Sequence, residues 1–488
     1  MLQNEKTALS GRVEPAVWQS SAVICRERQN WTQNVRPQAI PLTSISTCFE
    51  MFQADLDLQP TLPQDCSIVA SALSPQTWSF SLKWLPPAAY LVGGNVRDAL
   101  LGRRADYLDL DFVLPEGAVQ TAKAIANYYN AGFVLLDAER QIARVVFERA
   151  TVDFAQQVGP SLETDLQRRD FTVNAIAYNP HSEQLLDPIH GYGDLQRRQI
   201  RMIAPENLEE DPLRLLRAYR QAAQLDFVLE PNTQTTIRQL ADLLREIAPE
   251  RVQSELNYLL GTAKGTPFLA LAWEDGLLQH WLPSATAAGL VQIADIDRTA
   301  IAFAASCPAF SVELVGWLRD QQKTSGLGRS WLRIAKLASL MDSNLPTAEA
   351  QLWRLKYSRA EVQSVLTVLK YLPQVEALDL LLASRKNQYV FFQAVGAAFP
   401  ALAVLAVARG LDQEAIAPLC SRFLTATDPI AHPSPLLTGR DLMTTLHIPA
   451  GPCIGQLLEA LQVAQAEGKI GTSQEALTFA EIWIQHKK

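Results

Sequence analysis

Two aspartates, Asp109 and Asp111, are the strongest candidates for chemistry in this chain. They flank Leu110 in an apolar stretch, residues 107–114, whose alternation predicts a β-strand. Successive side chains of a strand point to opposite faces, so both carboxylates should share one face. Two adjacent carboxylates repel each other unless a cation lies between them, and hard divalent cations such as Mg²⁺ take oxygen ligands. The alternative is a solvated strand edge, the commoner explanation of an isolated Asp-x-Asp pair.

A glycine pair, Gly93 and Gly94, precedes these aspartates and favours the metal site over the solvated strand edge. Residues 89–92 predict a short strand, and residues 95–101 predict a helix that Gly102 would end. A strand, a Gly-Gly turn and a helix leave bare backbone N–H groups at the helix N-terminus, where a phosphate binds favourably. A Gly-Gly turn alone is usually only a turn. Followed by a carboxylate pair, it indicates metal-assisted chemistry on a nucleoside triphosphate.

Five segments, in order, resemble the motifs of class II tRNA nucleotidyltransferases and bacterial poly(A) polymerases. The first motif is matched by LVGGNVRD at 91–98, LGR at 101–103 and DLD at 109–111. The second is matched by RRDFTVNA at 168–175, and the hinge motif by DPIHGYGDL at 187–195. The fourth and fifth are matched by EDPLR at 210–214 and ERVQSE at 250–255. The region after about residue 265 carries no recognisable motif.

The resemblance implies roles for individual residues. Asp109 and Asp111 would be the catalytic pair and would bind Mg²⁺, which lowers the pKa of the RNA 3′-hydroxyl and stabilises the leaving pyrophosphate. Asp153 is a candidate third metal ligand, and the alternative is an ordinary exposed strand residue. The candidate nucleotide-binding residues are Gly93, Gly94, Arg97, Asp98, Arg169, Asp170, Asn174, Asp211, Arg214 and Arg217.

Asp211 and Arg214 are the candidates for choosing the base. They are three residues apart on a predicted helix and should therefore share one face. One side chain accepts hydrogen bonds and the other donates them, which suffices to recognise the Watson–Crick edge of a base without a nucleic-acid template. The alternative for Asp211 is a helix N-cap before Pro212, and that for Asp170 is likewise a cap. Arg217 and Arg220 continue the same face.

The expected fold is an α/β nucleotidyltransferase head with a small mixed sheet, followed by an all-α neck, body and tail. Further strands are expected at 133–136, 143–148 and 151–154, and helices at 123–129, 213–225, 236–244 and 251–260. The expected divisions are a poorly patterned extension at 1–84, the head at 85–195, the neck at 196–265 and the tRNA-binding body and tail at 266–488. Met51 is a candidate alternative start.

Composition limits the other possibilities. The chain has 488 residues, 48% of them hydrophobic and 19% charged, which predicts a globular protein of several domains. Its net charge of -8 argues against nucleic acid, but 17 of the 18 basic residues between 91 and 260 are arginine, the side chain suited to phosphates. Six scattered cysteines without a Cys-x-x-Cys pair argue against zinc and favour the cytoplasm. The uncharged run 387–408 is interpreted as a buried helical hairpin, so no membrane partner is expected.

The sequence therefore predicts a template-independent enzyme that adds nucleotides from CTP, ATP or both to the 3′ end of tRNA. Members that build the whole CCA end have a long flexible loop after the strand that corresponds to Asp153. Here only residues 154–167 separate Asp153 from Arg168, so addition of CC alone is expected, with full CCA addition as the alternative. A poly(A) polymerase or A-adding enzyme is the rival within the family, and an inactive RNA-binding relative is the rival from another class. The oligomeric state stays open.

Overall fold

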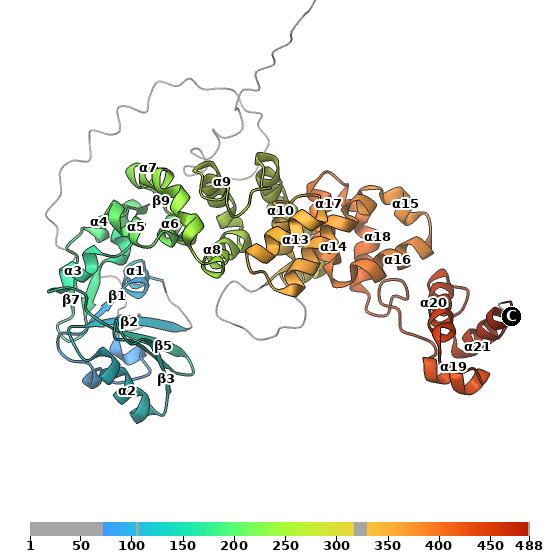
Figure 1. Cartoon of the computed structure of the whole chain (residues 1–488), viewed down its shortest axis with the longest axis horizontal. Coiled ribbons are helices and arrows are strands. Elements are labelled where there is room, and N and C mark those ends of the chain that lie inside the picture. The colour runs from blue at the N-terminus through green and yellow to red at the C-terminus, as the bar shows by residue number, and fades with distance from the viewer. Residues whose placement is uncertain (1–71, 104–106, 317–328, 487–488) are drawn as a thin grey trace, which may run out of the picture. The chain divides into compact units, whose positions relative to one another are not determined.

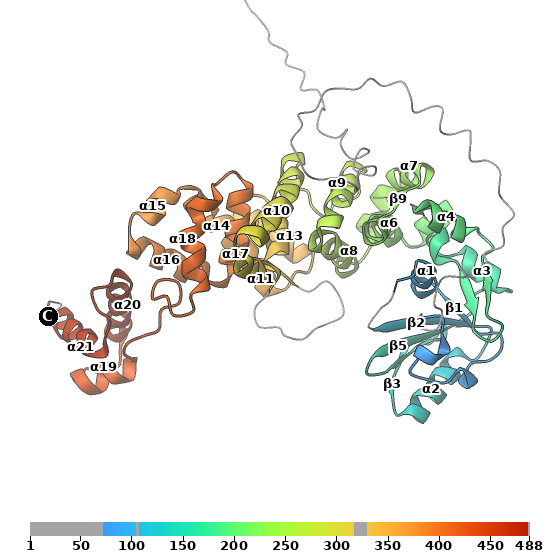
Figure 2. The ribbon, with the colours of Figure 1, turned by 180° about the vertical axis from the view of Figure 1, so that it is seen from behind.

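The computed structural model describes residues 72–103, 107–316 and 329–486, and Figures 1 and 2 show them from two sides. Met51 and most of the expected N-terminal extension lie outside these residues. The last part of that extension is packed, because Leu73, Trp78 and Phe80 are buried. The ring of Trp78 lies 5.2 Å from that of Phe112. The packed head therefore starts before residue 85, the boundary predicted from the sequence.

A seven-stranded mixed sheet forms the head, with its strands in the order β3-β4-β5-β2-β1-β6-β7. Strands β2 and β5 are parallel, and the other neighbours are antiparallel. The strands are β1 (Tyr90–Val92), β2 (Leu108–Leu114), β3 (Gly132–Asp137), β4 (Ile142–Val146), β5 (Ala150–Gln156), β6 (Ala177–Asn179) and β7 (Gln184–Leu186). The mixed α/β head is thus confirmed, and β6 and β7 are strands that were not predicted from the sequence.

The two faces of this sheet differ in character. Leu110, Phe112 and Phe154 are buried on the face that α2 (Ala118–Tyr129) covers. The opposite face carries Asp109 and Asp111, as the alternation of β2 predicts. Three further helices complete the head: α1 (Gly94–Leu100), α3 (Leu162–Gln167) and α4 (Gly191–Arg197).

Helices dominate the rest of the chain, as expected (Figure 1). The neck contains α5 (Pro205–Glu210), α6 (Leu213–Leu225), α7 (Pro231–Leu240) and α8 (Pro249–Gly261). One departure is a short parallel ladder between β8 (Gln199–Ile200) and β9 (Val228–Leu229). The following helices are α9 (Thr266–Glu274), α10 (Ala287–Ser306), α11 (Pro308–Val315), α12 (Trp331–Ala338), α13 (Leu345–Arg354), α14 (Arg359–Glu376), α15 (Leu378–Leu382), α16 (Arg385–Val395), α17 (Phe399–Ala408), α18 (Gln413–Leu424), α19 (Gly439–Leu446), α20 (Pro452–Glu467) and α21 (Ser473–Gln485).

The long uncharged run consists of α16 and α17. The chain turns between them at Gly396, whose φ of 52° lies in the left-handed region that favours glycine. By length and composition the segment Arg385–Ala408 could cross a membrane, but 67% of its most apolar window is buried inside the protein. Every residue from Phe399 to Ala406 is buried. The run therefore supplies core helices to the body.

Candidate functional site

The carboxylate pair lies on the open face of the sheet. Asp109 is exposed and Asp111 is half-buried, and the apolar residues between and beside them face the core. The hydroxyl of Thr151 on β5 donates a hydrogen bond to Asp109, and the side chain of Asn95 donates to the backbone carbonyl of Asp109. These contacts fix the first residues of β2 against α1 and β5.

The environment of Asp111 suits a cation. Burial, followed by the nearby negative charges of Asp153 and Asp109, raises the pKa of Asp111 to about 7. A divalent cation held between Asp109 and Asp111 would relieve this repulsion, and carboxylate oxygens are the ligands that Mg²⁺ prefers. Within the described ranges, no cluster of three or more His, Cys, Asp or Glu side chains could hold a metal ion. The pair of Asp109 and Asp111 thus fits a metal by its chemistry, with two protein carboxylates.

Asp153, the candidate third ligand, is engaged by Arg144 in this structure. Arg144 Nε lies 2.6 Å from Asp153 Oδ1, and Nη2 lies 2.8 Å from Oδ2. Both oxygens of the carboxylate are therefore used in a two-pronged ion pair. Direct metal binding by Asp153 stays a prediction, and it would have to compete with this pair.

A pocket of about 310 Å³ collects six of the ten residues predicted to bind a nucleotide. They come from the first motif, on the turn and α1, and from the second motif, which follows α3. The neck closes the pocket with side chains from α6. The lining residues are Gly93, Gly94, Arg97, Arg169, Asp170, Asn174, Arg220, Gln221 and Gln224.

Gly93 lets the backbone approach the carboxylates closely. Its φ is 78°, a left-handed value that other residues adopt only with strain. A Cβ atom there would lie 3.4 Å from Asp111 Oδ2 and 3.7 Å from Arg169 Nη1. The turn therefore brings bare backbone between the carboxylates of β2 and the arginine of the second motif.

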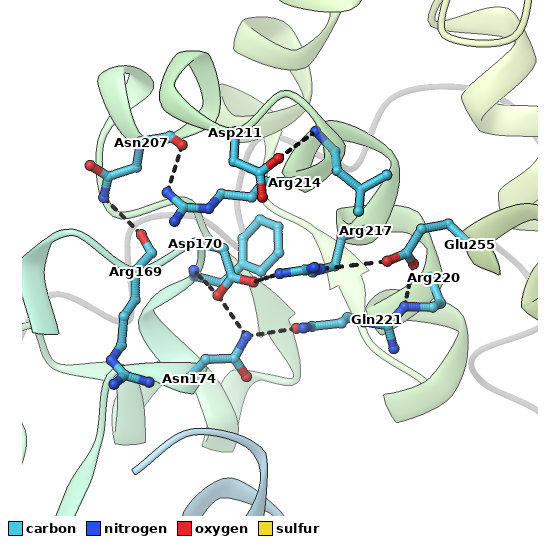
Figure 3. Close-up of polar contacts among 12 residues, drawn as sticks. Arg169, Asp170, Asn174, Asn207, Asp211, Arg214, Arg217, Arg220, Gln221 and Glu255 are labelled. Atoms are coloured by element: carbon cyan, nitrogen blue, oxygen red, sulfur yellow. Dashed lines mark hydrogen bonds and ion pairs between the residues drawn. The ribbon is translucent and has the colours of Figure 1, made fainter. Parts of the chain in front are cut away.

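A hydrogen-bonded network orders the second motif inside this pocket (Figure 3). Asn174 Oδ1 accepts from Arg97 at 2.7 Å, and Asn174 Nδ2 donates to Asp170 Oδ1 at 2.8 Å and to Gln221 Oε1 at 2.9 Å. Asp98 is not among the lining residues and instead pairs with Arg97 at 3.0 Å. Asp98 therefore orients Arg97, which in turn contacts the network.

Arg169 lies where this pocket meets a second one of about 210 Å³. Its Nη2 pairs with Asp165 of α3 at 3.2 Å, whereas its buried Nε has no hydrogen-bond partner in the part of the chain that is described. Arg140, Arg168 and Arg214 also line the second pocket. This concentration of guanidinium groups favours an anionic ligand.

The predicted base-selecting pair is arranged differently from the expectation. Asp211 is not on a helix with Arg214, because α6 begins at Leu213 and Asp211 has an extended backbone with φ −135°. The cause is Pro212, since a residue before proline is disfavoured in helical conformation. Asp211 Oδ1 accepts the N–H of Leu213 at 3.4 Å, but the N-cap of α6 is Pro212 and not Asp211, the cap considered from the sequence.

The fifth motif holds the fourth in place through Arg251. Arg251 donates to both oxygens of Asp211, at 2.8 and 3.1 Å. Burial would raise the pKa of Asp211, but the hydrogen bond and charge of Arg251 outweigh it and lower that pKa. Arg214 donates from Nη1 to the carbonyl oxygens of Asn207 and Arg168, at 2.7 and 3.2 Å.

Arg217 and Arg220 meet at one buried carboxylate, Glu255 of α8. Arg217 lies 3.5 Å from both Glu255 and Asp170, and Arg220 forms a very short ion pair with Glu255. Arg217 therefore bridges the second and fifth motifs. The partners that fix the site had no role predicted from the sequence; they are Arg144, Asp165, Gln221, Arg251 and Glu255.

Comparison with known proteins agrees with this geometry. Residues 89–201 match the family model of the Poly A polymerase head domain. Residues 226–288 match an RNA and SrmB-binding site of polymerase A, and residues 329–480 match a tRNA nucleotidyltransferase domain 2. A CC-adding tRNA nucleotidyltransferase of Synechocystis sp. is 50% identical over 404 residues, which cover 82% of this chain and 95% of the relative.

This chain belongs to the tRNA nucleotidyltransferase family.

Other members of the family differ in what their names say they add. A CC-adding enzyme of Geobacter sulfurreducens is 33% identical over 80% of this chain and 91% of its own length. An A-adding enzyme of Deinococcus radiodurans is 34% identical over 82% of this chain and 96% of its own length. A solved structure of a CCA-adding enzyme with CTP shares the fold, with a TM-score of 0.63 at 22% identity over 82% of this chain and 90% of that one. The predicted family, fold and nucleotidyltransferase class are confirmed.

Proposed function

We propose that this nucleotidyltransferase adds two CMP residues, and no terminal AMP, to the 3′ end of tRNA, with release of pyrophosphate in the cytoplasm. The observation that carries the proposal is the connection between β5 and α3, which is only residues 157–161. Relatives named as CC-adding enzymes support the same choice. The resemblance described above implies a long flexible loop at this place in members with full CCA activity.

This connection is held to both β2 and α3. The N–H of Gln157 donates to the carbonyl of Leu114 at 2.7 Å, and the N–H of Val158 donates to Asp165 at 3.1 Å. A Cβ atom on Gly159 would lie 2.6 Å from a side-chain atom of Thr164, so the turn is closely packed. A fixed turn cannot move as a lid, and the base-selecting residues should therefore keep one specificity.

The residues around the pocket would divide the work of binding the nucleotide. The backbone of Gly93 and Gly94 and the side chains of Arg97 and Arg169 would hold the triphosphate, because bare N–H groups and guanidinium groups suit phosphate oxygens. Asp170 and Asn174, ordered by the network around them, would bind the ribose. These roles agree with the positions of the four side chains in the pocket.

Asp109 and Asp111 would hold Mg²⁺, the cofactor expected for this enzyme. When bound, the metal would lower the pKa of the RNA 3′-hydroxyl and neutralise charge on the phosphates. The protein's own contribution is to keep both carboxylates on one open face and to bring Gly93 against them. The two substrates would then meet on that face.

Base choice would rest on Asp211, Arg214 and Arg217. Arg251 holds Asp211, and Glu255 holds Arg217. Arg214 uses only its Nη1 for its two hydrogen bonds to backbone carbonyl oxygens. Its Nε and Nη2 have no hydrogen-bond partner in residues 72–103, 107–316 and 329–486. They can donate to the O2 and N3 acceptors of cytosine, which supports CTP as the substrate.

The identity of the added nucleotides is a direct test. The protein is incubated with Mg²⁺, CTP, ATP and a tRNA that ends at its discriminator base, and the product ends are sequenced. We expect CC. An end that reads CCA from this protein alone would show that the fixed turn does not exclude adenosine, and a run of adenosines would instead indicate a poly(A) polymerase.

Removal of the Arg214 side chain should weaken base discrimination. Loss of a good two-pronged base contact costs about 1–3 kcal/mol of discrimination, so Arg214→Ala should lower the preference for CTP over UTP and ATP by about tenfold or more. The preference is measured as a ratio of kcat/KM values. Arg197→Ala, at an exposed arginine of α4, is the control for loss of charge. An unchanged preference in the Arg214 variant would contradict the assigned role.

A further inference from the structure

Arg144 lies on the same face of the sheet as the catalytic carboxylates, yet it belongs to none of the five motifs. In the strand register Asp111 of β2 is opposite Asp153 of β5, which is opposite Arg144 of β4. Residues opposite one another on neighbouring strands point to the same face. Asp111, Asp153 and Arg144 therefore form one row across three strands.

The pair of Arg144 and Asp153 is a fixed cation beside the active site. Arg144 uses Nε and Nη2 to bind Asp153, and its Nη1 has no hydrogen-bond partner in the described part of the chain. The Arg144 side chain is 38% exposed and that of Asp153 is 19% exposed. The hydrogen bond to Asp153 raises the pKa of Arg144, and the charges of Asp153, Asp109 and Asp111 raise it further, against the opposing effect of burial. One edge of a permanently charged guanidinium is thus available to a ligand.

The order of the strands indicates which ligand the free edge of the Arg144 guanidinium would bind. The nucleotide pocket lies on the β1 side of β2, where Gly93 and Gly94 follow β1, whereas Arg144 lies two strands away on the other side. Phosphoryl transfer places the attacking and leaving oxygens roughly in line on opposite sides of the phosphorus. The RNA 3′-hydroxyl should therefore arrive over β5 and β4. The anionic group of the RNA nearest to that hydroxyl is the last phosphodiester.

We propose that Arg144 binds the last phosphodiester of the acceptor RNA and that Asp153 is the positioning residue that holds it there. The inference rests on the proposed function and adds a contact to the acceptor substrate. Arginine suits the role because its planar fork can pair with a carboxylate on one edge and a phosphate on the other. Lysine, a single point charge, cannot hold both in a fixed geometry.

The first experiment compares Arg144→Gln with the wild-type protein in steady-state kinetics. A lost phosphate contact should raise the KM for tRNA about tenfold, with the KM for CTP and kcat unchanged. The slope of log KM for tRNA against log salt should fall by about one. Arg149→Gln, in the exposed turn between β4 and β5, is the matched control for removal of a positive charge. An equal effect of both variants would overturn the proposal.

The second experiment removes the charge from the RNA instead. A tRNA acceptor minihelix carries a neutral methylphosphonate at its last linkage. For the wild-type protein, the KM for this RNA should be about tenfold higher than for the ordinary RNA. For Arg144→Gln, the two KM values should be equal. A structural role of Arg144 would leave both proteins equally sensitive to the neutral linkage, and that result would also overturn the proposal.

Asp153→Asn separates positioning from metal binding. A positioning role predicts a smaller rise in the KM for tRNA than Arg144→Gln causes, and no additional effect of Asp153→Asn in the double variant. A large loss of kcat from Asp153→Asn in either background would make Asp153 a metal ligand and overturn the positioning role. Failure of the wild-type protein to add CMP to tRNA would overturn the proposed function instead.

Discussion

Asp109→Asn and Asp111→Asn should each lower the rate of CMP incorporation by about a thousandfold, or about 4 kcal/mol of transition-state stabilisation. Both substitutions keep the shape of the side chain but remove a charged oxygen ligand from the proposed metal site. Folding should change little, because Asp109 is exposed and Asp111 carries a pKa already raised to about 7 by burial and by neighbouring carboxylates. Asparagine in place of Asp111 relieves that repulsion.

The measurement pairs single-turnover incorporation with a thermal melt and with tRNA binding. Glu116→Gln, at an exposed position just after β2, is the matched control and should keep full activity. Both aspartate variants should bind tRNA and unfold at nearly the wild-type temperature. Appreciable incorporation by both single variants would refute the metal-site assignment, whereas early unfolding would mean that the lost activity reports on stability instead.

The parts of the fold that were predicted correctly have strong local signals. The strand with Asp109 and Asp111 alternates from Leu108 to Phe112, and α6 has both bounds at the predicted residues, Leu213 and Leu225. Strands β6 and β7 were missed because they depend on distant pairing: β6 pairs with β1, and β7 pairs with β6. Residues 73–84 were assigned to the extension because their burial depends on tertiary contacts such as that between Trp78 and Phe112.

The residues of the site also fall into those that the sequence could predict and those that it could not. Motif residues such as Gly93 and Asp170 could be named from the sequence, since each motif is local and the structure gathers them in one pocket. Their partners could not, because Glu255 reaches Arg217 across 38 positions and Arg251 reaches Asp211 across 40. Asp165 and Arg144 are exceptions. Asp165 lies only four positions from Arg169. Arg144 lies only nine positions from Asp153 on the next strand of a hairpin, so the strand register would have been enough to pair them.

Lys336→Met should destabilise the protein by about 3–5 kcal/mol, the usual result of removing one partner from a buried ion pair. Lys336 of α12 is fully buried, and its Nζ lies 2.6 Å from Asp297 of α10. It also donates at 3.2 Å to the carbonyl oxygen of Thr262 and to the hydroxyl of Thr266. Burial lowers the pKa of Lys336, and the charge and hydrogen bond of Asp297 oppose that effect. Without the ammonium group, the charge of Asp297 would stay buried without an opposite charge, although the hydroxyl of Thr266 still donates to it.

Urea unfolding measures this effect, and Lys370→Met at an exposed position of α14 is the control. The double variant Lys336→Met with Asp297→Leu should recover part of the loss, because an apolar pair of suitable volume avoids the cost of a lone buried charge. Thr262 directly follows α8, which carries Arg251 and Glu255, so the hydrogen bond from Lys336 to the carbonyl oxygen of Thr262 also connects the neck to the body. Below the unfolding transition, the CC product should stay the same. A single variant as stable as the wild-type protein would show that Asp297 finds another partner or takes up a proton at little cost.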